Sequence, residues 1–180
     1  MTLTADRVSP HSKSDEHAWL EQALQQHWNR VHAVVFRLVG DADEAEDLAL
    51  EAFWQLHQSR PSLVDDSSLR GWLYRVATNL GLNALRARRR RQQYESAAGE
   101  QPSSADTAQE AERLIERLRT RQALAQLKPR SAQILLLRHS GLSYAEIAAA
   151  LQIAPASVGT LLARAEREFE QQYRRLEMGG

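Results

Sequence analysis

Apolar residues recur at three- and four-residue intervals along most of this chain, and that spacing is typical of amphipathic helices. Strong helix formers dominate the composition, whereas glycine and proline account for only 8 and 5 of the 180 residues. No convincing stretch shows the alternating, β-branched pattern of a strand. The sequence therefore predicts an all-α fold.

A small, polar stretch interrupts the helical pattern. Residues Glu95–Thr107 read ESAAGEQPSSADT, and their glycine and proline favour a loop. A flexible linker here would let two small helical modules move relative to each other, and an ordered loop within one domain is the alternative. The expected organisation is a disordered tail (1–16), a first module (17–94), a linker (95–108) and a second module (109–178).

Each module is expected to contain several helices. In the first module the pattern predicts helices over about 16–39, 43–58 and 67–93, and either Ser67 or Ser68 is a good N-cap for the third. In the second module the predicted helices cover about 109–127, 131–139, 143–151 and 155–176. The predicted buried stripe of the second helix consists of Ala45, Leu48, Ala49, Ala52, Phe53 and Leu56.

Several classes of function lack the residues that they need. The absence of cysteine excludes disulfides, thiolate catalysis and cysteine-based zinc sites. The six histidines have no metal-ligand spacing, so we expect no catalytic residue, no metal and no cofactor. No apolar run approaches the roughly 18 residues that span a bilayer, and the N-terminus lacks the apolar core of a secretory signal. The expectation is a cytoplasmic protein that is not an enzyme and does not insert into a membrane.

The third helix ends in a run of arginines although the formal net charge of the chain is zero. Arginine pairs with phosphates and asparagine can hydrogen-bond base edges, so one face of this helix predicts a contact with DNA. The alternative is a solvated face whose arginines interact with the negative end of the helix dipole. The candidate DNA-binding residues are Arg75, Asn79, Asn83, Arg86 and Arg90.

The second helix is strongly acidic, with no basic residue from Gly40 to Gln58 apart from a histidine. Leu50 and Trp54 fall outside its buried stripe, and Asp47 and Glu51 flank them. Exposed apolar side chains between carboxylates favour a protein-docking face. The alternative is that another helix covers Leu50 and Trp54.

A third feature is the sequence GLSYAEIAAALQIAPASVGTLLARAERE, which begins at Gly141. Ser143 and Glu146 have the spacing of a capping box, and a short turn precedes Pro155 near the start of the next helix. Two short helices joined this tightly predict a helix-turn-helix, with a plain helical hairpin as the alternative. Its DNA-binding candidates on the second helix are Ser157, Thr160, Arg164 and Arg167.

The motifs DADEAEDLALEAFWQL, LRGWLYRVATNLGLNALRARRRR and ALAQLKPRSAQILLLRHSGLSYAEIAAALQIAPASVGTLLARAE occur in this order. Together they resemble a bacterial RNA polymerase sigma factor of the extracytoplasmic-function group, over about residues 19–173. The resemblance implies a factor that binds core RNA polymerase, recognises promoter DNA and assists strand opening for transcription initiation. It also implies an anti-sigma factor as an inhibitory partner.

Residue roles follow from the same resemblance. The acidic helix is similar to the segment that docks on the clamp helices of the largest catalytic polymerase subunit. Asp47, Leu48, Glu51 and Phe53 match its motif, and Asp47 and Glu51 are the contact candidates beside Leu50 and Trp54. The third helix resembles the segment that melts promoters and reads the minus-ten element, whereas the second module resembles the minus-thirty-five reader.

The same resemblance implies a site for a flipped-out base and raises the question of an aromatic side chain that could stack on it. The loop over about 60–68 occupies the position where such factors hold an unstacked base. Trp72 could stack on that base, but its place on the apolar stripe favours burial in the core.

The second module departs from the family pattern at several positions. Gly159 and Leu161 stand where a basic residue and an arginine are common, and Glu166 stands where a third basic residue is frequent. Gln152 replaces the usual turn glycine, at a cost of about 1 kcal/mol if this residue has a positive φ. In the first module, Leu50 stands where glutamine is common. These changes predict weak phosphate binding by the second module and reliance on tethering to polymerase.

Two other functions fit the residues. An ordinary helix-turn-helix repressor or activator would use the first module to dimerise or to sense a ligand. A helical adaptor would bind proteins only. An enzyme fits least well, because no nucleophile–base pair or phosphate-binding glycine loop is present.

Overall fold

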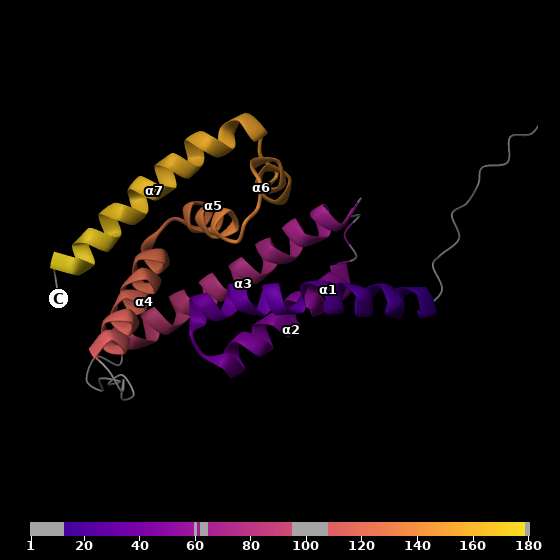
Figure 1. Cartoon of the computed structure of the whole chain (residues 1–180), viewed down its shortest axis with the longest axis horizontal. Coiled ribbons are helices and arrows are strands. Elements are labelled where there is room, and N and C mark those ends of the chain that lie inside the picture. Colours follow the sequence, from indigo (N-terminus) through magenta and orange to yellow (C-terminus); the bar gives the residue numbers. More distant parts are fainter. Residues whose placement is uncertain (1–12, 60, 62–64, 95–107, 179–180) are drawn as a thin grey trace, which may run out of the picture.

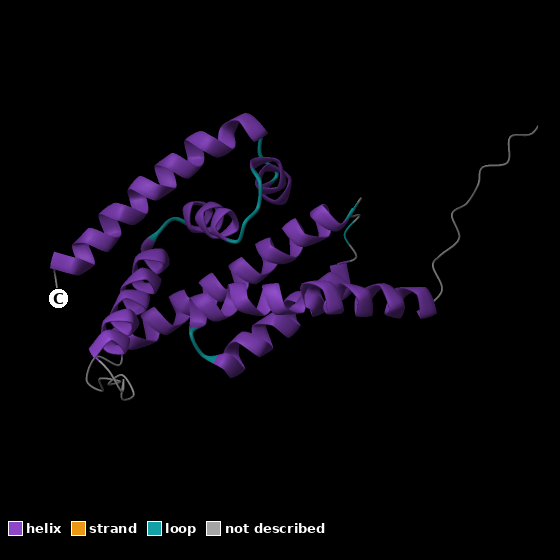
Figure 2. Cartoon of the chain, in the orientation of Figure 1, coloured by secondary structure: helices purple, strands orange, loops and turns teal. Residues whose placement is uncertain are grey.

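The computed structural model describes residues 13–59, 61, 65–94 and 108–178. Over these residues the chain is helical with no strand (Figure 2), which confirms the all-α prediction. The predicted tail lies outside the described residues as far as residue 12, and 13–16 already belong to the first helix. The linker over 95–107 also lies outside them. The helices are α1 (Lys13–Val39), α2 (Ala42–Ser59), α3 (Asp66–Tyr94), α4 (Ala108–Gln126), α5 (Pro129–His139), α6 (Tyr144–Leu151) and α7 (Pro155–Met178).

The first module is a three-helix bundle of α1, α2 and α3. The α2 stripe packs inward as predicted, with Ala45, Ala49 and Leu56 fully buried and Leu48 partly buried against the same core. A sharp turn joins α1 to α2 at Gly40, whose φ is 78°. The Asp41 carboxylate then accepts a hydrogen bond of 2.8 Å from the Glu44 backbone, which satisfies a free N–H group in the first turn of α2.

The start of α3 differs from the prediction of a serine cap. The helix begins at Asp66, and Asp65 caps it by accepting a hydrogen bond of 2.8 Å from the Ser68 backbone. Hydrogen bonds from Ser68 and Ser67 hold the pKa of Asp65 below its ordinary value. Both predicted serines therefore lie within the first turn of the helix, and the carboxylate upstream takes the capping position.

The second module contains the predicted helix-turn-helix. The Ser143–Glu146 capping box is present in full at the start of α6, and α6 meets α7 at 92°. The α7 carboxylate of Glu168 binds the start of α5, through the Lys128 backbone at 3.2 Å and the Ser131 hydroxyl at 2.7 Å. Burial raises the pKa of Glu168, but these hydrogen bonds outweigh it and hold the pKa below its ordinary value.

The two modules pack against each other along α3. Figure 1 shows α3 between α1 and α2 on one side and the helices of the second module on the other. A buried cluster joins Leu82 and Leu85 of α3 to Leu124 and Leu127 of the second module, and Leu38 of α1 completes it. A larger cluster also runs from Val35 of α1 into α5, α6 and α7. The described helices therefore form one packed body.

We expect Gln152→Gly to stabilise the protein. Gln152 ends α6 in the left-handed region, with φ 53° and ψ 52°, as its place in the turn predicted. Glycine adopts this conformation without the Cβ penalty, so the free energy of unfolding should rise by about 1 kcal/mol. Urea unfolding measures the change. As a control, Gln122→Gly on the exposed surface of α4 should lower it by about 1 kcal/mol, and a destabilised Gln152→Gly would contradict this assignment.

Candidate nucleic-acid interface

The outer face of α2 carries exposed apolar side chains among carboxylates. Leu50 is 50% and Trp54 is 56% exposed, although Phe53 between them is buried. Asp47 and Glu51 are exposed on the same face, and Glu51 accepts a hydrogen bond of 2.9 Å from Gln55. No helix among the described residues covers Leu50 or Trp54. The alternative prediction, that another helix buries these two side chains, is therefore wrong for the described chain. The face has the composition of a protein-docking surface.

The predicted DNA face of α3 is not free. Asn83 and Arg90 are exposed, but Arg75, Asn79 and Arg86 are partly buried against the second module. The side-chain amide of Gln133 on α5 donates a hydrogen bond to the Asn79 side chain. Arg86 donates to the Leu127 backbone oxygen at 3.2 Å. Burial lowers the pKa of Arg86, and the positive charge of Arg90 nearby lowers it further. Three of the five residues predicted to contact DNA are therefore not freely accessible in this structure.

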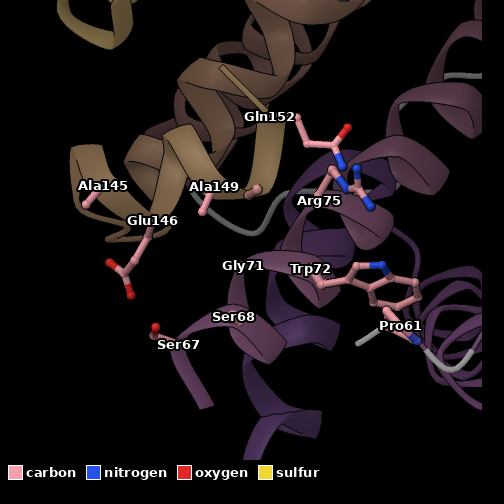
Figure 3. A pocket seen from close by; sticks show the side chains of 11 residues that line it. Pro61, Ser67, Ser68, Gly71, Trp72, Arg75, Ala145, Glu146, Ala149 and Gln152 are labelled. Atoms are coloured by element: carbon pink, nitrogen blue, oxygen red, sulfur yellow. The ribbon is translucent and has the colours of Figure 1, made fainter. Parts of the chain in front are cut away.

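A pocket of about 520 Å³ lies where the N-terminal half of α3 faces α6. In Figure 3 the side chains of Arg75 and Gln152 extend into the same part of it, and Trp72 lies beside Pro61. Trp72 packs against the core as predicted, yet it is only partly buried and its remaining surface lines the pocket. Of the loop predicted to hold a base, residues 60 and 62–64 lie outside the described residues.

An ion pair joins α3 to α6 next to this pocket. Arg70 of α3 donates a hydrogen bond to the Glu146 carboxylate, and neither side chain is more than 29% exposed. Glu146 also completes the capping box of α6, through a hydrogen bond of 2.8 Å from the Ser143 backbone. One carboxylate thus organises the helix-turn-helix and holds it against α3.

The predicted contact residues of α7 are largely accessible. Thr160, Arg164 and Arg167 are exposed, and Ser157 is partly buried. Arg167 donates to the Ala163 backbone oxygen at 3.2 Å, which keeps its guanidinium along the helix surface. The second module therefore offers its candidate DNA face to solvent, in contrast to α3.

Two arginines that were not predicted as structural residues hold the α1–α2 turn. Arg88 donates to the Val39 backbone oxygen at 3.1 Å and to the Glu44 carboxylate at 3.3 Å. Arg121 of α4 donates to the Arg37 backbone oxygen at 2.9 Å. Burial lowers the pKa of Arg121, and the nearby charges of Arg117 and Arg88 lower it further. Arg88 and Arg121 both bind carbonyl oxygens at the negative end of α1. One member of the arginine run is therefore a structural residue.

A second stripe on α3 also escaped prediction. Tyr74, Thr78, Leu82 and Leu85 are buried at four- and three-residue intervals, beside the core-facing side chains of Leu73 and Ala77. Their spacing was visible in the sequence and indicates that a second set of helices covers α3.

The described part of the chain lacks the residue groupings of a metal site and a single helix of membrane-spanning character. No group of three or more potential ligands there could hold a metal ion. No single helix there is long and apolar enough to cross a membrane. Taken together, α6 and α7 have the length and composition of a membrane span, but they are bent by 92° relative to each other.

The fold and its surfaces define a two-module helical protein with a helix-turn-helix and an acidic helix that exposes apolar side chains. Residues 23–91 match the family described as Sigma-70 region 2, and residues 117–169 match Sigma-70, region 4. The RNA polymerase sigma-H factor of Pseudomonas aeruginosa is 33% identical, over 79% of this chain and 78% of that protein. The chain therefore belongs to the extracytoplasmic-function type of RNA polymerase sigma factors.

Other relatives agree with this assignment. The RNA polymerase sigma factor YlaC of Bacillus subtilis is 30% identical, over 84% of this chain and 90% of that protein. The ECF RNA polymerase sigma factor SigE of Mycolicibacterium smegmatis is 32% identical over 84% of this chain, which spans 59% of that relative's length. The sigma factor RpoE of Bartonella quintana, solved in complex with the anti-sigma factor NepR, has a similar fold, with a TM-score of 0.51, 21% identity, and coverage of 86% of this chain and 96% of that one. Sigma factors of this family act with RNA polymerase in promoter recognition and initiation.

We expect Leu50→Ser and Trp54→Ser to leave the fold almost unaffected. Both side chains are about half exposed, so each substitution should change the free energy of unfolding by no more than about 0.5 kcal/mol. The buried neighbour Phe53 is the control, since Phe53→Ala should cost about 3–5 kcal/mol. Urea unfolding compares the three variants. A large loss for either serine variant would mean that the α2 face serves the fold.

Proposed function

We propose that this chain binds core RNA polymerase through the outer face of α2 and directs it to promoters. The observation that carries the proposal is the exposure of Leu50 and Trp54 between Asp47 and Glu51. Apolar side chains give such an interface its affinity, and the carboxylates select a basic partner surface. The clamp helices of the largest polymerase subunit are the proposed partner surface.

The proposed DNA contacts are divided between the modules. In the first module (17–94), Arg75, Asn79, Asn83, Arg86 and Arg90 bind the opened minus-ten strand. In the second module (109–178), Ser157, Thr160, Arg164 and Arg167 bind the upstream element in the major groove. The linker (95–108) joins two weak contacts into a stronger one by raising their effective concentration.

We further propose that the chain must open before α3 can bind DNA. Gln133 and the Leu127 carbonyl occupy hydrogen-bonding groups of Asn79 and Arg86, and α6 faces Arg75 across the pocket. DNA and the second module therefore compete for the same side chains. Because the α2 face lies outside this contact, polymerase can dock on the closed chain and favour the open state by binding it more tightly.

The remaining features of the proposal concern chemistry, location and inhibition. The factor carries out no reaction of its own and works in the cytoplasm. An anti-sigma factor is a proposed partner, supported by the fold shared with a factor whose complex with such an inhibitor has been solved.

Reversing the charge of the docking face should abolish initiation. Asp47→Lys with Glu51→Lys places two cations against the proposed basic partner surface, which converts attraction into repulsion. Run-off transcription with purified core polymerase should fall to the background measured without the factor. Circular dichroism should be unchanged, because both side chains are exposed.

A matched control separates docking from net charge. Glu112→Lys with Glu116→Lys makes the same change of charge at the same four-residue spacing on the exposed surface of α4. This variant should retain run-off activity. Full activity of the Asp47→Lys, Glu51→Lys variant would remove the docking assignment.

Gln133→Ala should increase the affinity of the free chain for single-stranded promoter DNA. The substitution removes a partner of Asn79 and weakens the closed arrangement by about 1 kcal/mol, which corresponds to about a 5-fold shift toward the open state. Fluorescence anisotropy with a minus-ten-strand oligonucleotide measures the gain. Gln122→Ala on α4 is the matched control, and equal affinities for the two variants would contradict masking.

A further inference from the structure

A second cleft, of about 380 Å³, lies at the junction of the modules, and none of its lining residues is a proposed DNA contact. Its walls come from α1, the start of α3 and the end of α5. Three arginines line it, namely Arg30, Arg37 and Arg70, together with His139 and the buried Tyr74. None of its lining residues is a carboxylate. The composition is that of an anion site, and neither the docking face nor the DNA faces described above include it.

The positive charge of the cleft is only partly neutralised. Arg70 is paired with Glu146, whereas within the described chain neither Arg30 nor Arg37 forms an ion pair. Arg30 and Arg37 instead line the cleft together with Tyr74. Burial raises the pKa of Tyr74, and the nearby arginines oppose this only in part, so the hydroxyl remains protonated and can donate to a bound anion.

We propose that this cleft binds a compact anion that carries several phosphate groups. Guanidinium groups present parallel N–H donors that match phosphate oxygens, and two unpaired guanidinium groups favour a ligand with more than one phosphate. The hydroxyls of Tyr74 and Ser140, which also line the cleft, supply uncharged hydrogen-bonding groups. The volume suits a small ligand, since such pockets usually enclose roughly 300–1,000 Å³.

The bound anion stabilises the closed arrangement. His139 and Ser140 belong to the second module, and the other walls belong to the first, so the complete cleft exists only while the modules are packed. A ligand that binds one arrangement more tightly shifts the equilibrium toward it. This step rests on the proposed function, in which α3 must separate from the second module, and it makes the anion a negative effector of initiation.

The test uses inorganic tripolyphosphate and the full chain. Isothermal titration calorimetry should give saturable binding at one site per chain, and Arg30→Gln with Arg37→Gln should weaken it at least about 10-fold, the effect of losing about 1.4 kcal/mol of binding energy. The control is Arg113→Gln with Arg175→Gln, which removes two exposed positive charges elsewhere and should leave the affinity unchanged. Equal weakening in both double variants would mean nonspecific attraction and would overturn the site.

A second measurement tests the link to the closed state and the alternative source of phosphate. Tripolyphosphate should reduce association of the wild-type chain with core polymerase, and of the control variant equally, but not of the Arg30→Gln, Arg37→Gln variant. If tripolyphosphate binds but changes polymerase association equally in the wild type and in the Arg30→Gln, Arg37→Gln variant, the anion is not a negative effector. If the wild type ignores tripolyphosphate and the variant loses affinity for single-stranded promoter DNA, the cleft is a DNA backbone contact and the proposal fails. A chain that never associates with polymerase refutes the proposed function, whereas calorimetry still decides the anion site.

Discussion

The structure depends on α3 being buried on two sides. Against α1 the helices approach closely at Gly81, where an added Cβ would lie 2.6 Å from the Leu38 side chain. Next to this point Leu82 and Leu85 face the second module and bury against Leu124 and its neighbours. Because adjacent positions of one helix serve both modules, the packing of either module constrains the other. Burial of these leucines, each contributing about 1.5–3 kcal/mol, exceeds the net contribution of the surrounding hydrogen bonds.

Local charge distinguishes the surfaces on this core, since the formal net charge of the chain is zero. The carboxylates of α2 leave α2 unsuited to approach DNA, whereas the arginine-rich end of α3 and the outer face of α7 attract phosphates. Arg88 joins the two regions by pairing with Glu44 while it binds the Val39 carbonyl. The ion pair thus links the acidic helix to the arginine-rich helix within the first module.

Much of this structure could be predicted from local sequence, because caps and stripes depend on residues within a turn or two. The Ser143–Glu146 box, the buried stripe of α2 and the exposure of Trp54 all follow from such spacing. The partners of Asn79 and Arg86 could not be predicted, because Gln133 and Leu127 lie 54 and 41 residues away and their approach depends on the packing of whole helices. The cap of α3 was misplaced for a different reason. Aspartate and serine are nearly equal N-cap residues, so a run of candidates does not decide between them.

The contacts that close the molecule also set how easily it opens. They combine the cluster of Leu82 and Leu85 with a larger buried cluster, to which Leu73 of α3 and Ile147 of α6 both belong, and with polar contacts such as Arg70 with Glu146. Partly exposed polar contacts are weak in net terms, because water replaces them when they break. Opening the molecule therefore exposes apolar surface along both halves of α3, and this surface, rather than the polar contacts, dominates its cost. A partner can favour the open state only by binding it more tightly than the closed state by at least this cost.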